Sequence, residues 1–179
     1  MFLITLKKNK KGFTLIELVI VVAVIGVLSG LILNAINVQG VRQKGRDAQR
    51  KAALKQIQTA LELYYTEFRR YPNSGGAYIS ASTSSGLGAT LNSSYISQLP
   101  ADPSFGTAVF SSGNCSSPYG YSYRSDGASR YILLAKTEID ESAADSRCST
   151  FTNICSNPPT GLGWGCNCSS NCYAVQNPL

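Results

Sequence analysis

Histidine is absent from this chain of 179 residues. Because histidine is the commonest general base and the commonest metal ligand, its absence argues against an enzyme and against a metal site. No proline occurs between Phe13 and Tyr71, so nothing in that long segment is expected to break a helix. Cysteine is absent from the first half of the chain, and no C-x-x-C pair occurs anywhere. These absences favour a structural or binding protein that begins with a long helix, with no catalytic residue and no cofactor.

Residues 13 to 36 form an almost wholly apolar run in which Glu17 is the one charged residue. A helix of about 20 apolar residues spans a bilayer core of about 30 Å, so this run is long enough. An ordinary secretory signal has an apolar region of only about 7–15 residues and a small-x-small cleavage site, and none follows Ile36. An uncleaved signal anchor stays open as an alternative. Gly26 and Gly30 form a weak G-x-x-x-G signal for close helix packing.

The segment from about Gln39 to Arg70 carries apolar residues every three or four positions, as one face of a helix does. These residues are Leu54, Ile57, Leu61, Tyr64 and Phe68. The polar residues expected on the opposite side are Lys55, Gln58, Glu62 and Glu67. We expect one continuous helix from Phe13 to about Arg70, roughly 87 Å long at 1.5 Å per residue. Pro72 ends it, because the residue before a proline is pushed out of the helical region.

The remainder of the chain predicts a small β-sheet head. Residues 73 to 117 are rich in small polar residues and are expected to be loops, with a rigid turn at residues 99–103. Alternating patterns predict strands at residues 119–124 and 131–136, joined by a hairpin turn at residues 125–128. Beyond Asp140 no periodicity is readable, and we expect a disulfide-stapled tail wrapped on the sheet.

An even number of cysteines is confined to the second half, which favours disulfides formed in an oxidising compartment. They are Cys115, Cys148, Cys155, Cys166, Cys168 and Cys172. A zinc cluster is the alternative, but the chain offers neither a C-x-x-C pair nor a histidine partner. The sequence does not choose among the possible pairings.

The junction Lys10-Lys11-Gly12 followed by Phe-Thr-Leu-Ile-Glu at residues 13–17 resembles the class III signal of type IV prepilins and type II secretion pseudopilins. A Tyr-Pro after the long helix, the Leu-Pro-x-Asp-Pro turn and the paired tyrosine strands are similar to major pseudopilins and Gram-positive-type pilins. The resemblance covers residues 7–138 and implies the α+β pilin fold, in which a long N-terminal helix packs on a small antiparallel sheet. The implied parts are a leader (1–12), a transmembrane and filament-core helix (13–38), its amphipathic half (39–71), and a globular β head with a disulfide-rich tail (72–179).

The resemblance also implies how the chain is processed, how it assembles and where it is located. A prepilin peptidase would cut between Gly12 and Phe13 and methylate the new amino group of Phe13. Glu17 would then pair with that cationic group on a neighbouring subunit, although a capping box with Thr14 is a second account of the same carboxylate. The implied partners are copies of the chain and related pilins, the peptidase, a membrane platform protein with its assembly ATPase, and the lipid bilayer before assembly. The implied location is a single pass in the inner or cytoplasmic membrane with the head outside the cytoplasm, then a periplasmic or extracellular filament.

Several interpretations stay open at this stage. The filament is either a type IV pilus or a secretion pseudopilus, and the alternative function is a minor tip subunit that binds DNA or surfaces through its tail. The formal charge is +6, of which the four leader lysines account for most, since 6 − 4 = +2. Much of the remaining positive charge lies in one cluster, which consists of Arg42, Lys44, Arg46, Arg50, Lys51 and Lys55, opposed by Asp47. This cluster is expected to contact lipid headgroups, neighbouring subunits or DNA, or to be a solvated helix face.

No metal site is expected. Major pseudopilins hold calcium in a loop of the head, but this chain has no matching run of acidic residues. Asp140, Glu141 and Asp145 are instead expected to form a solvated acidic surface.

Overall fold

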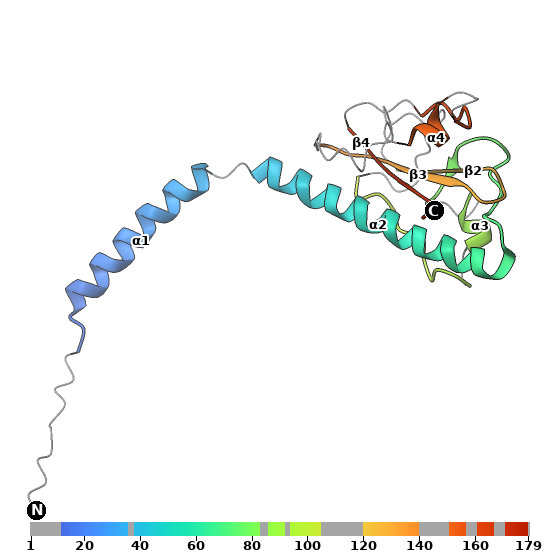
Figure 1. Ribbon diagram of the computed structural model, residues 1–179. Helices are drawn as coiled ribbons and strands as arrows, with labels where there is room; N and C mark the ends of the chain where they lie inside the picture. The colour runs from blue at the N-terminus through green and yellow to red at the C-terminus, as the bar shows by residue number, and fades with distance from the viewer. Residues whose placement is uncertain are drawn as a thin grey trace, which may run out of the picture. The chain divides into compact units, whose positions relative to one another are not determined.

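The computed structural model describes residues 12–35, 38–82, 86–91, 94–104, 120–139, 151–156, 161–166 and 171–178. The chain divides into two compact units, residues 1–40 and residues 41–179 (Figure 1). Each unit is described by itself. Among the sequence predictions, Cys115, Cys148, Cys168 and the acidic residues from Asp140 to Asp145 lie outside the described residues.

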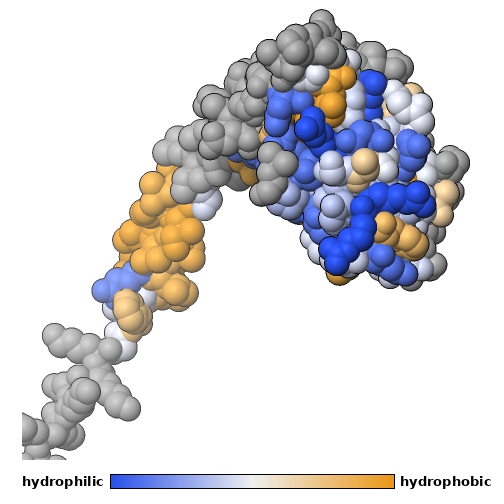
Figure 2. All heavy atoms as spheres, turned by 45° about the vertical axis from the view of Figure 1, so that its right-hand side comes forward, coloured by the Kyte–Doolittle hydropathy of each residue, from blue (hydrophilic) through white to orange (hydrophobic). Residues whose placement is uncertain are grey.

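The described part of the first unit is formed by helix α1, which runs from Leu15 to Ala35, and the first residues of the next helix. The described side chains of α1 are exposed and almost all apolar, and they form the orange surface in Figure 2. Within the described residues, no helix meets the length and hydropathy needed to cross a membrane.

The second helix, α2, runs from Val38 to Phe68. Residues 36 and 37 lie outside the described residues, so the continuity of α1 and α2 stays a prediction. The helix ends slightly earlier than expected, because Arg69 adopts a left-handed backbone with φ of 54° and its amide still donates to the Tyr65 carbonyl. This conformation is a common way to end a helix.

The head is built around one antiparallel sheet with the strand order β1-β2-β3-β4. Its strands are Ile79–Ser80, Tyr121–Ser125, Tyr131–Lys136 and Cys172–Gln176. The predicted hairpin is present, with Tyr123 opposite Leu133. Its turn is held by Asp126, whose carboxylate accepts hydrogen bonds from the amides of Ala128 and Arg130 at 2.8 and 3.0 Å.

Helix α2 covers one face of the sheet. The predicted stripe is correct for Leu54, Ile57 and Leu61, which are fully buried against the sheet. Burying apolar surface in this way is the main source of folding free energy. Tyr64 is partly buried, and the last predicted member, Phe68, is wrong because it is exposed. A short helix, α3 (Gly88–Leu91), adds Leu91 to the same core. The fold class predicted from the sequence is therefore confirmed.

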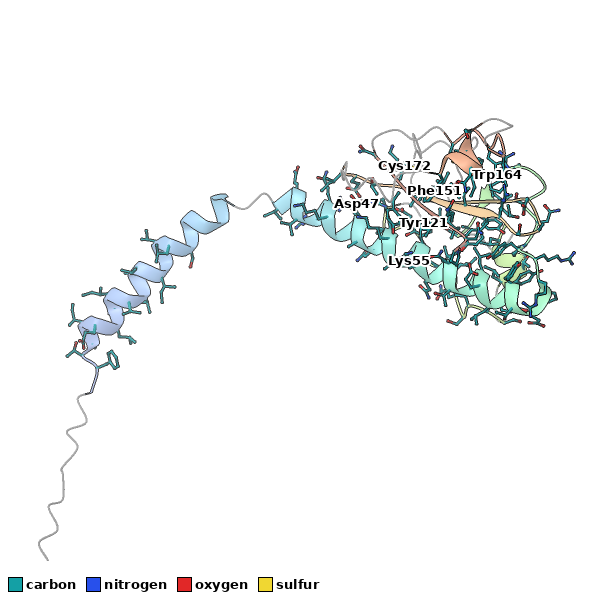
Figure 3. The ribbon with its side chains drawn as sticks, in the orientation of Figure 1. Asp47, Lys55, Tyr121, Phe151, Trp164 and Cys172 are labelled. Atoms are coloured by element: carbon teal, nitrogen blue, oxygen red, sulfur yellow. A yellow bond between two sulfur atoms is a disulfide. The ribbon has the colours of Figure 1, made fainter. Side chains whose placement is uncertain are left out.

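The C-terminal tail covers the other face of the sheet, as expected. Helix α4 (Thr152–Cys155) and the segment around Trp164 pack on Ile132 and Leu134. Figure 3 shows Trp164 and Phe151 on the side of the sheet away from α2. The tail also supplies strand β4, which the sequence analysis missed.

Disulfide bonds fasten this tail. Cys155 at the end of α4 is bonded to Cys166, with a Cα–Cα distance of 4.9 Å. Cys172 at the start of β4 is also disulfide-bonded. The presence of disulfides in the tail is thus confirmed, and the pairing of all six cysteines stays a prediction.

Candidate functional site

The N-terminal end of α1 forms a complete capping box. The backbone amide and the hydroxyl of Thr14 both donate to Glu17 Oε2 at 2.8 Å, and the Glu17 amide donates back to Thr14 Oγ1 at 3.3 Å. This reciprocal arrangement satisfies amides that a helix start leaves without partners. Among the described residues, both hydrogen bonds that Thr14 donates to the carboxylate go to Oε2, so Oε1 takes no part in the capping box.

Gly12 and Phe13, which precede the capping residue Thr14, are both exposed. Phe13 is 90% exposed. A Cβ added at Gly12 would meet no heavy atom within 4 Å, and its φ does not lie in the left-handed range. Neither packing nor backbone conformation therefore requires glycine at this position in the folded chain. The same absence of close contacts holds for Gly26 and Gly30 on α1.

The head contains a cluster of charged side chains, centred on Arg50. Its guanidinium is fully buried and binds Asp102 through two hydrogen bonds, at 2.8 Å from Nε and 3.1 Å from Nη2. It also donates to Asp47 at 2.7 Å, to Glu138 at 2.9 Å and to Ser104 at 2.9 Å. Every N–H donor of the guanidinium is thus used, which is what a buried cation needs.

The carboxylates around Arg50 also bind the backbone. Asp47 accepts hydrogen bonds from the amides of Glu138 and Ile139 at 2.9 to 3.1 Å, just after β3. Asp102 accepts from the Ser104 amide at 2.8 Å. The cluster therefore ties three separate parts of the head together: the start of α2, the turn at residues 99–103 and the end of β3.

Electrostatics in this cluster favour the charged forms. The pKa of Glu138 is lowered to about 2, chiefly because Arg46 donates hydrogen bonds to its carboxylate, with Arg50 acting in the same sense. Burial acts to lower the pKa of Arg50, but the hydrogen bonds to Asp102, Glu138 and Asp47 outweigh it and raise that pKa above its ordinary value.

This geometry corrects the interpretation of the basic cluster. Arg46 and Arg50 belong to the cluster expected to face lipid, DNA, a neighbour or solvent, yet Arg50 is buried inside the head and the partly exposed Arg46 is paired with Glu138. A signal for this was present in the sequence, because Asp47 and Arg50 continue the buried stripe of Leu54, three and four residues apart. The exposed members include Arg42, Lys44 and Lys55.

Glu62 is a second residue that the sequence analysis placed wrongly. It was expected on the solvent side of α2, but its carboxylate accepts hydrogen bonds from the hydroxyls of Tyr71 at 3.0 Å and Tyr131 at 2.9 Å. Gln58 likewise reaches the sheet, where its amide donates to the Gln176 carbonyl at 2.8 Å. Both residues border the core, so the polar face of α2 is narrower than the periodicity indicated.

No group of three or more His, Cys, Asp or Glu side chains in the described part of the chain is arranged to hold a metal ion. The carboxylates of Asp47, Asp102 and Glu138 do converge, but the Arg50 guanidinium already occupies the space between them.

Comparison with known families agrees with these observations. Residues 7–33 match the prokaryotic N-terminal methylation motif, which together with the fold defines a subunit of the pilin and pseudopilin class. Residues 37–131, more than half of the chain, match the family described as type II secretion system (T2SS), protein G. The chain belongs to this family. The predicted resemblance is thereby confirmed, and the tail beyond residue 131 lies outside the match.

Individual relatives agree with this placement. The type II secretion system core protein G of Escherichia coli (strain K12) is 32% identical over 99 residues, which cover 53% of this chain and 67% of that protein. The core protein G of Aeromonas hydrophila is 27% identical over 110 residues, covering 54% and 69%. The fimbrial protein EcpC of Eikenella corrodens is 33% identical over 94 residues, covering 52% and 56%. No solved structure matches the chain.

The Arg50 cluster generates a prediction about stability. Replacing Arg50 by Met leaves three carboxylates without their central cation, so the free energy of unfolding should fall by about 3–5 kcal/mol. Arg42→Met, at an exposed position of the same helix, is the matched control and should stay within about 0.5 kcal/mol of the parent. Urea unfolding of the detergent-solubilised chain, followed by circular dichroism, measures both. Equal stability of the two variants would show that the cluster does not hold the head together.

A pH dependence follows from Glu138. Its folded pKa, about 2, lies below the unfolded value of about 4.3, so its contribution is present above that value and is lost as the pH falls toward 2. We expect about 2 kcal/mol of stability to disappear across this range. The change should be smaller in Glu138→Gln, because glutamine does not titrate. Urea unfolding at a series of pH values tests this, and identical pH profiles for parent and variant would contradict it.

Proposed function

We propose that the chain is a structural subunit of the pseudopilus of a type II secretion system, without enzymatic activity. A prepilin peptidase removes residues 1–12 and methylates Phe13, and the mature subunit polymerises through α1. The observation that carries this proposal is the junction at Gly12 and Phe13, followed by a capped helix whose described side chains are almost all apolar.

The junction supports processing because the fold itself makes no use of it. Gly12 has neither a packing nor a conformational reason to be glycine, and Phe13 is exposed. A peptidase that must approach the scissile bond closely supplies the missing reason for a residue without a side chain. The match to the methylation motif across residues 7–33 supports the same reading.

The surface of α1 supports burial after synthesis. A helix that is apolar all round is stable where lipid or protein covers it. Before assembly we place residues 13–38 in the inner or cytoplasmic membrane, with the head outside the cytoplasm; after assembly they form the core of a periplasmic filament. Gly26 and Gly30 leave open space on the helix, which lets a neighbouring helix approach closely.

Glu17 supports assembly through a charge pair. The capping box engages Oε2 and leaves Oε1 available for the cationic amino group of Phe13 on a neighbouring subunit. In an environment of low dielectric, a charge pair of this kind is strongly attractive, whereas an unpaired charge is costly. The further partners are related pseudopilins, the peptidase, a membrane platform protein and its assembly ATPase.

The alternative of a tip subunit that binds DNA or surfaces receives no support from the comparisons. In addition, Arg50 is buried inside the head and does not contribute to a basic surface, and Arg46 is paired with the Glu138 carboxylate.

Processing is the first prediction of this proposal. In cells with a prepilin peptidase, the mature chain should start at Phe13 and carry one N-methyl group; without the peptidase it should keep its leader. Intact-mass measurement of the membrane fraction tests this, with Gly12→Val as a variant that should stay uncut. A mature start near Asn37 would contradict the proposal.

The two roles of Glu17 are separated by Glu17→Gln. Glutamine keeps the capping box but removes the negative charge. If the charge pair drives assembly, this variant should be inserted and cut normally, yet should form few filaments and accumulate as monomer. Sheared filaments counted by electron microscopy provide the readout, and Thr14→Ala, which removes the capping hydroxyl and keeps the charge, is the matched control. Parental filament yield from Glu17→Gln would remove the charge-pair mechanism.

A further inference from the structure

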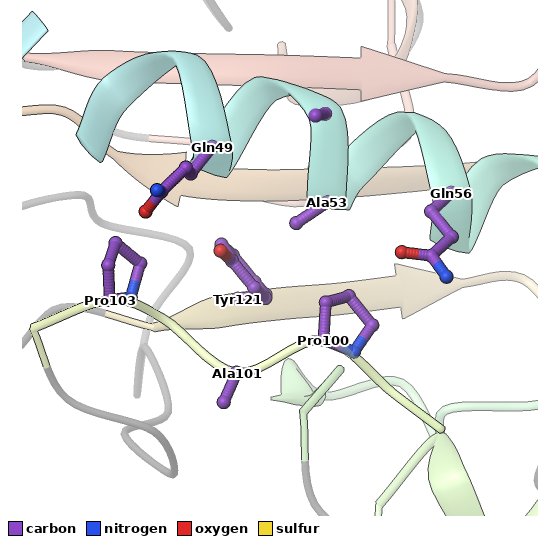
Figure 4. Close-up of a pocket in the computed structure, with 8 residues that line it drawn as sticks. Gln49, Ala53, Gln56, Pro100, Ala101, Pro103 and Tyr121 are labelled. Atoms are coloured by element: carbon purple, nitrogen blue, oxygen red, sulfur yellow. The ribbon is translucent and has the colours of Figure 1, made fainter. Parts of the chain in front are cut away.

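The two faces of the sheet are covered by separate sets of side chains. Residues of β3 alternate between them: Leu133 packs on the α2 side, whereas Ile132 and Leu134 pack on the other side. On the α2 side, Figure 4 shows Tyr121 of β2 pointing toward the helix, at a cavity of about 330 Å³ that α2 and the proline turn border. Because the two clusters share no buried side chain, one face can lose its cover while the other stays packed.

The face away from α2 is covered by a part of the tail that we name the Trp164 segment, which consists of the described residues 151–156 and 161–166. Its buried apolar side chains include Ile154 and Trp164, which are 2% and 7% exposed. The amides of Gly163 and Trp164 donate to the carbonyls of Ser156 and Ile154 at 2.6 and 3.3 Å and hold its two parts together. Its helix α4 has four residues, too few for a helix that is stable by itself.

The Cys155–Cys166 disulfide joins the two parts of this segment into a closed ring. A cross-link of this kind lowers the conformational entropy of the open chain and so favours the closed form. The Cys166 sulfur also lies 3.2 Å from the hydroxyl of Tyr78, a buried residue of the same face. Both cysteines are partly exposed, which reduction by a small thiol requires.

Arg124 of β2 positions Trp164 on the sheet. Its guanidinium lies 5.3 Å from the centroid of the Tyr78 ring and 5.4 Å from that of the Trp164 ring, and it donates to the Trp164 carbonyl at 3.1 Å. Contacts of a cation with aromatic rings are favourable but modest. Within the described residues, the buried Nε of Arg124 has no hydrogen-bond partner, which is unfavourable. The non-covalent contacts of the closed form are therefore weak enough for the cross-link to decide whether it is populated.

We propose that the Cys155–Cys166 disulfide is a redox-controlled closure of this face of the head. While the bond is intact, the Trp164 segment covers Ile132 and Leu134. A dithiol reductant converts the bond to two thiols and is itself oxidised to a disulfide, with two electrons and two protons transferred. The segment then leaves the sheet, while α2 and its core cluster stay folded. This inference concerns the head alone and does not rest on the proposed filament function.

The closure makes the surface of the head depend on oxidation. Before the bond forms, Ile132 and Leu134 of β3 lack part of their cover. An exposed apolar patch of this kind promotes association with other proteins, and an open segment is accessible to proteases. The head therefore becomes protease-resistant only after it has been oxidised.

The test replaces both cysteines, Cys155→Ser and Cys166→Ser, which removes the bond without leaving an unpaired thiol. In the detergent-solubilised chain, the emission of Trp164, the only tryptophan of the sequence, should move to longer wavelength because its ring becomes exposed. Cleavage by chymotrypsin after Phe151, Leu162 and Trp164 should become about tenfold faster or more. The helical signal in far-UV circular dichroism should stay at the parental level, because α2 keeps its own core.

Arg124→Gln separates the ring contact from the cross-link. It removes the cation between the two rings and keeps the disulfide, so cleavage should rise only about two- to fivefold. Arg130→Gln, at an exposed position of the same hairpin, is the matched control and should equal the parent. Dithiothreitol should shift the emission of the parent to that of the double serine variant, and reoxidation should restore it. The variant itself should respond little.

Four results would each overturn the proposal. Parental emission and cleavage in the double serine variant would mean that packing alone holds the segment on the sheet. Loss of its helical signal would mean that the bond stabilises the whole head and not one face. A tenfold effect of Arg124→Gln would assign the closure to the ring contact, and a large response of the double serine variant to dithiothreitol would assign it to another disulfide.

Discussion

The head depends on one buried cation. Arg50 lies where α2, the proline turn and the end of β3 meet, and it binds a carboxylate from each of them. Removing an arginine from water is unfavourable unless all of its donors are satisfied, and here they are. Because the partners lie far apart in the sequence, the cluster forms only when helix, turn and sheet are all in place. It therefore links the folding of the sheet to the position of the proline turn and of the cavity that the turn borders.

The two units of the chain differ in how much apolar surface they expose. In the head, α2 and the disulfide-bonded tail cover both faces of the sheet, so little apolar surface remains exposed on its described residues. Within the first unit, the described side chains of α1 are apolar and exposed. A helix with such a surface is stable where lipid or protein covers it.

The general fold was predictable because its determinants are local. The stripe at Leu54, Ile57 and Leu61 and the tyrosine hairpin follow from periodicity, and the turn follows from Asp126 with the glycine after it. Strand β4 was missed, since its five residues lie in a cysteine-rich region without recognisable alternation. The Arg50 cluster was missed for a different reason. Periodicity shows that Arg50 continues the buried stripe, but only the tertiary structure brings Asp102 and Glu138 to it, and charged residues are buried so seldom that a solvated face was the natural expectation.

At the N-terminal junction, the structure shows which oxygen of the Glu17 carboxylate forms the capping bonds. Capping and assembly are two accounts of one carboxylate that can coexist, because a carboxylate has two oxygens, and the capping bonds from Thr14 use only Oε2. Capping fixes the side chain close to the start of the helix, which in the proposed assembly would reduce the entropy lost when Oε1 binds a cation. The capping box would then prepare the acid for the proposed charge pair. If the chain is cut before Phe13 as proposed, the exposed Phe13 and the capped acid four residues later would form one unit, in which the helix start positions the group that assembly would use.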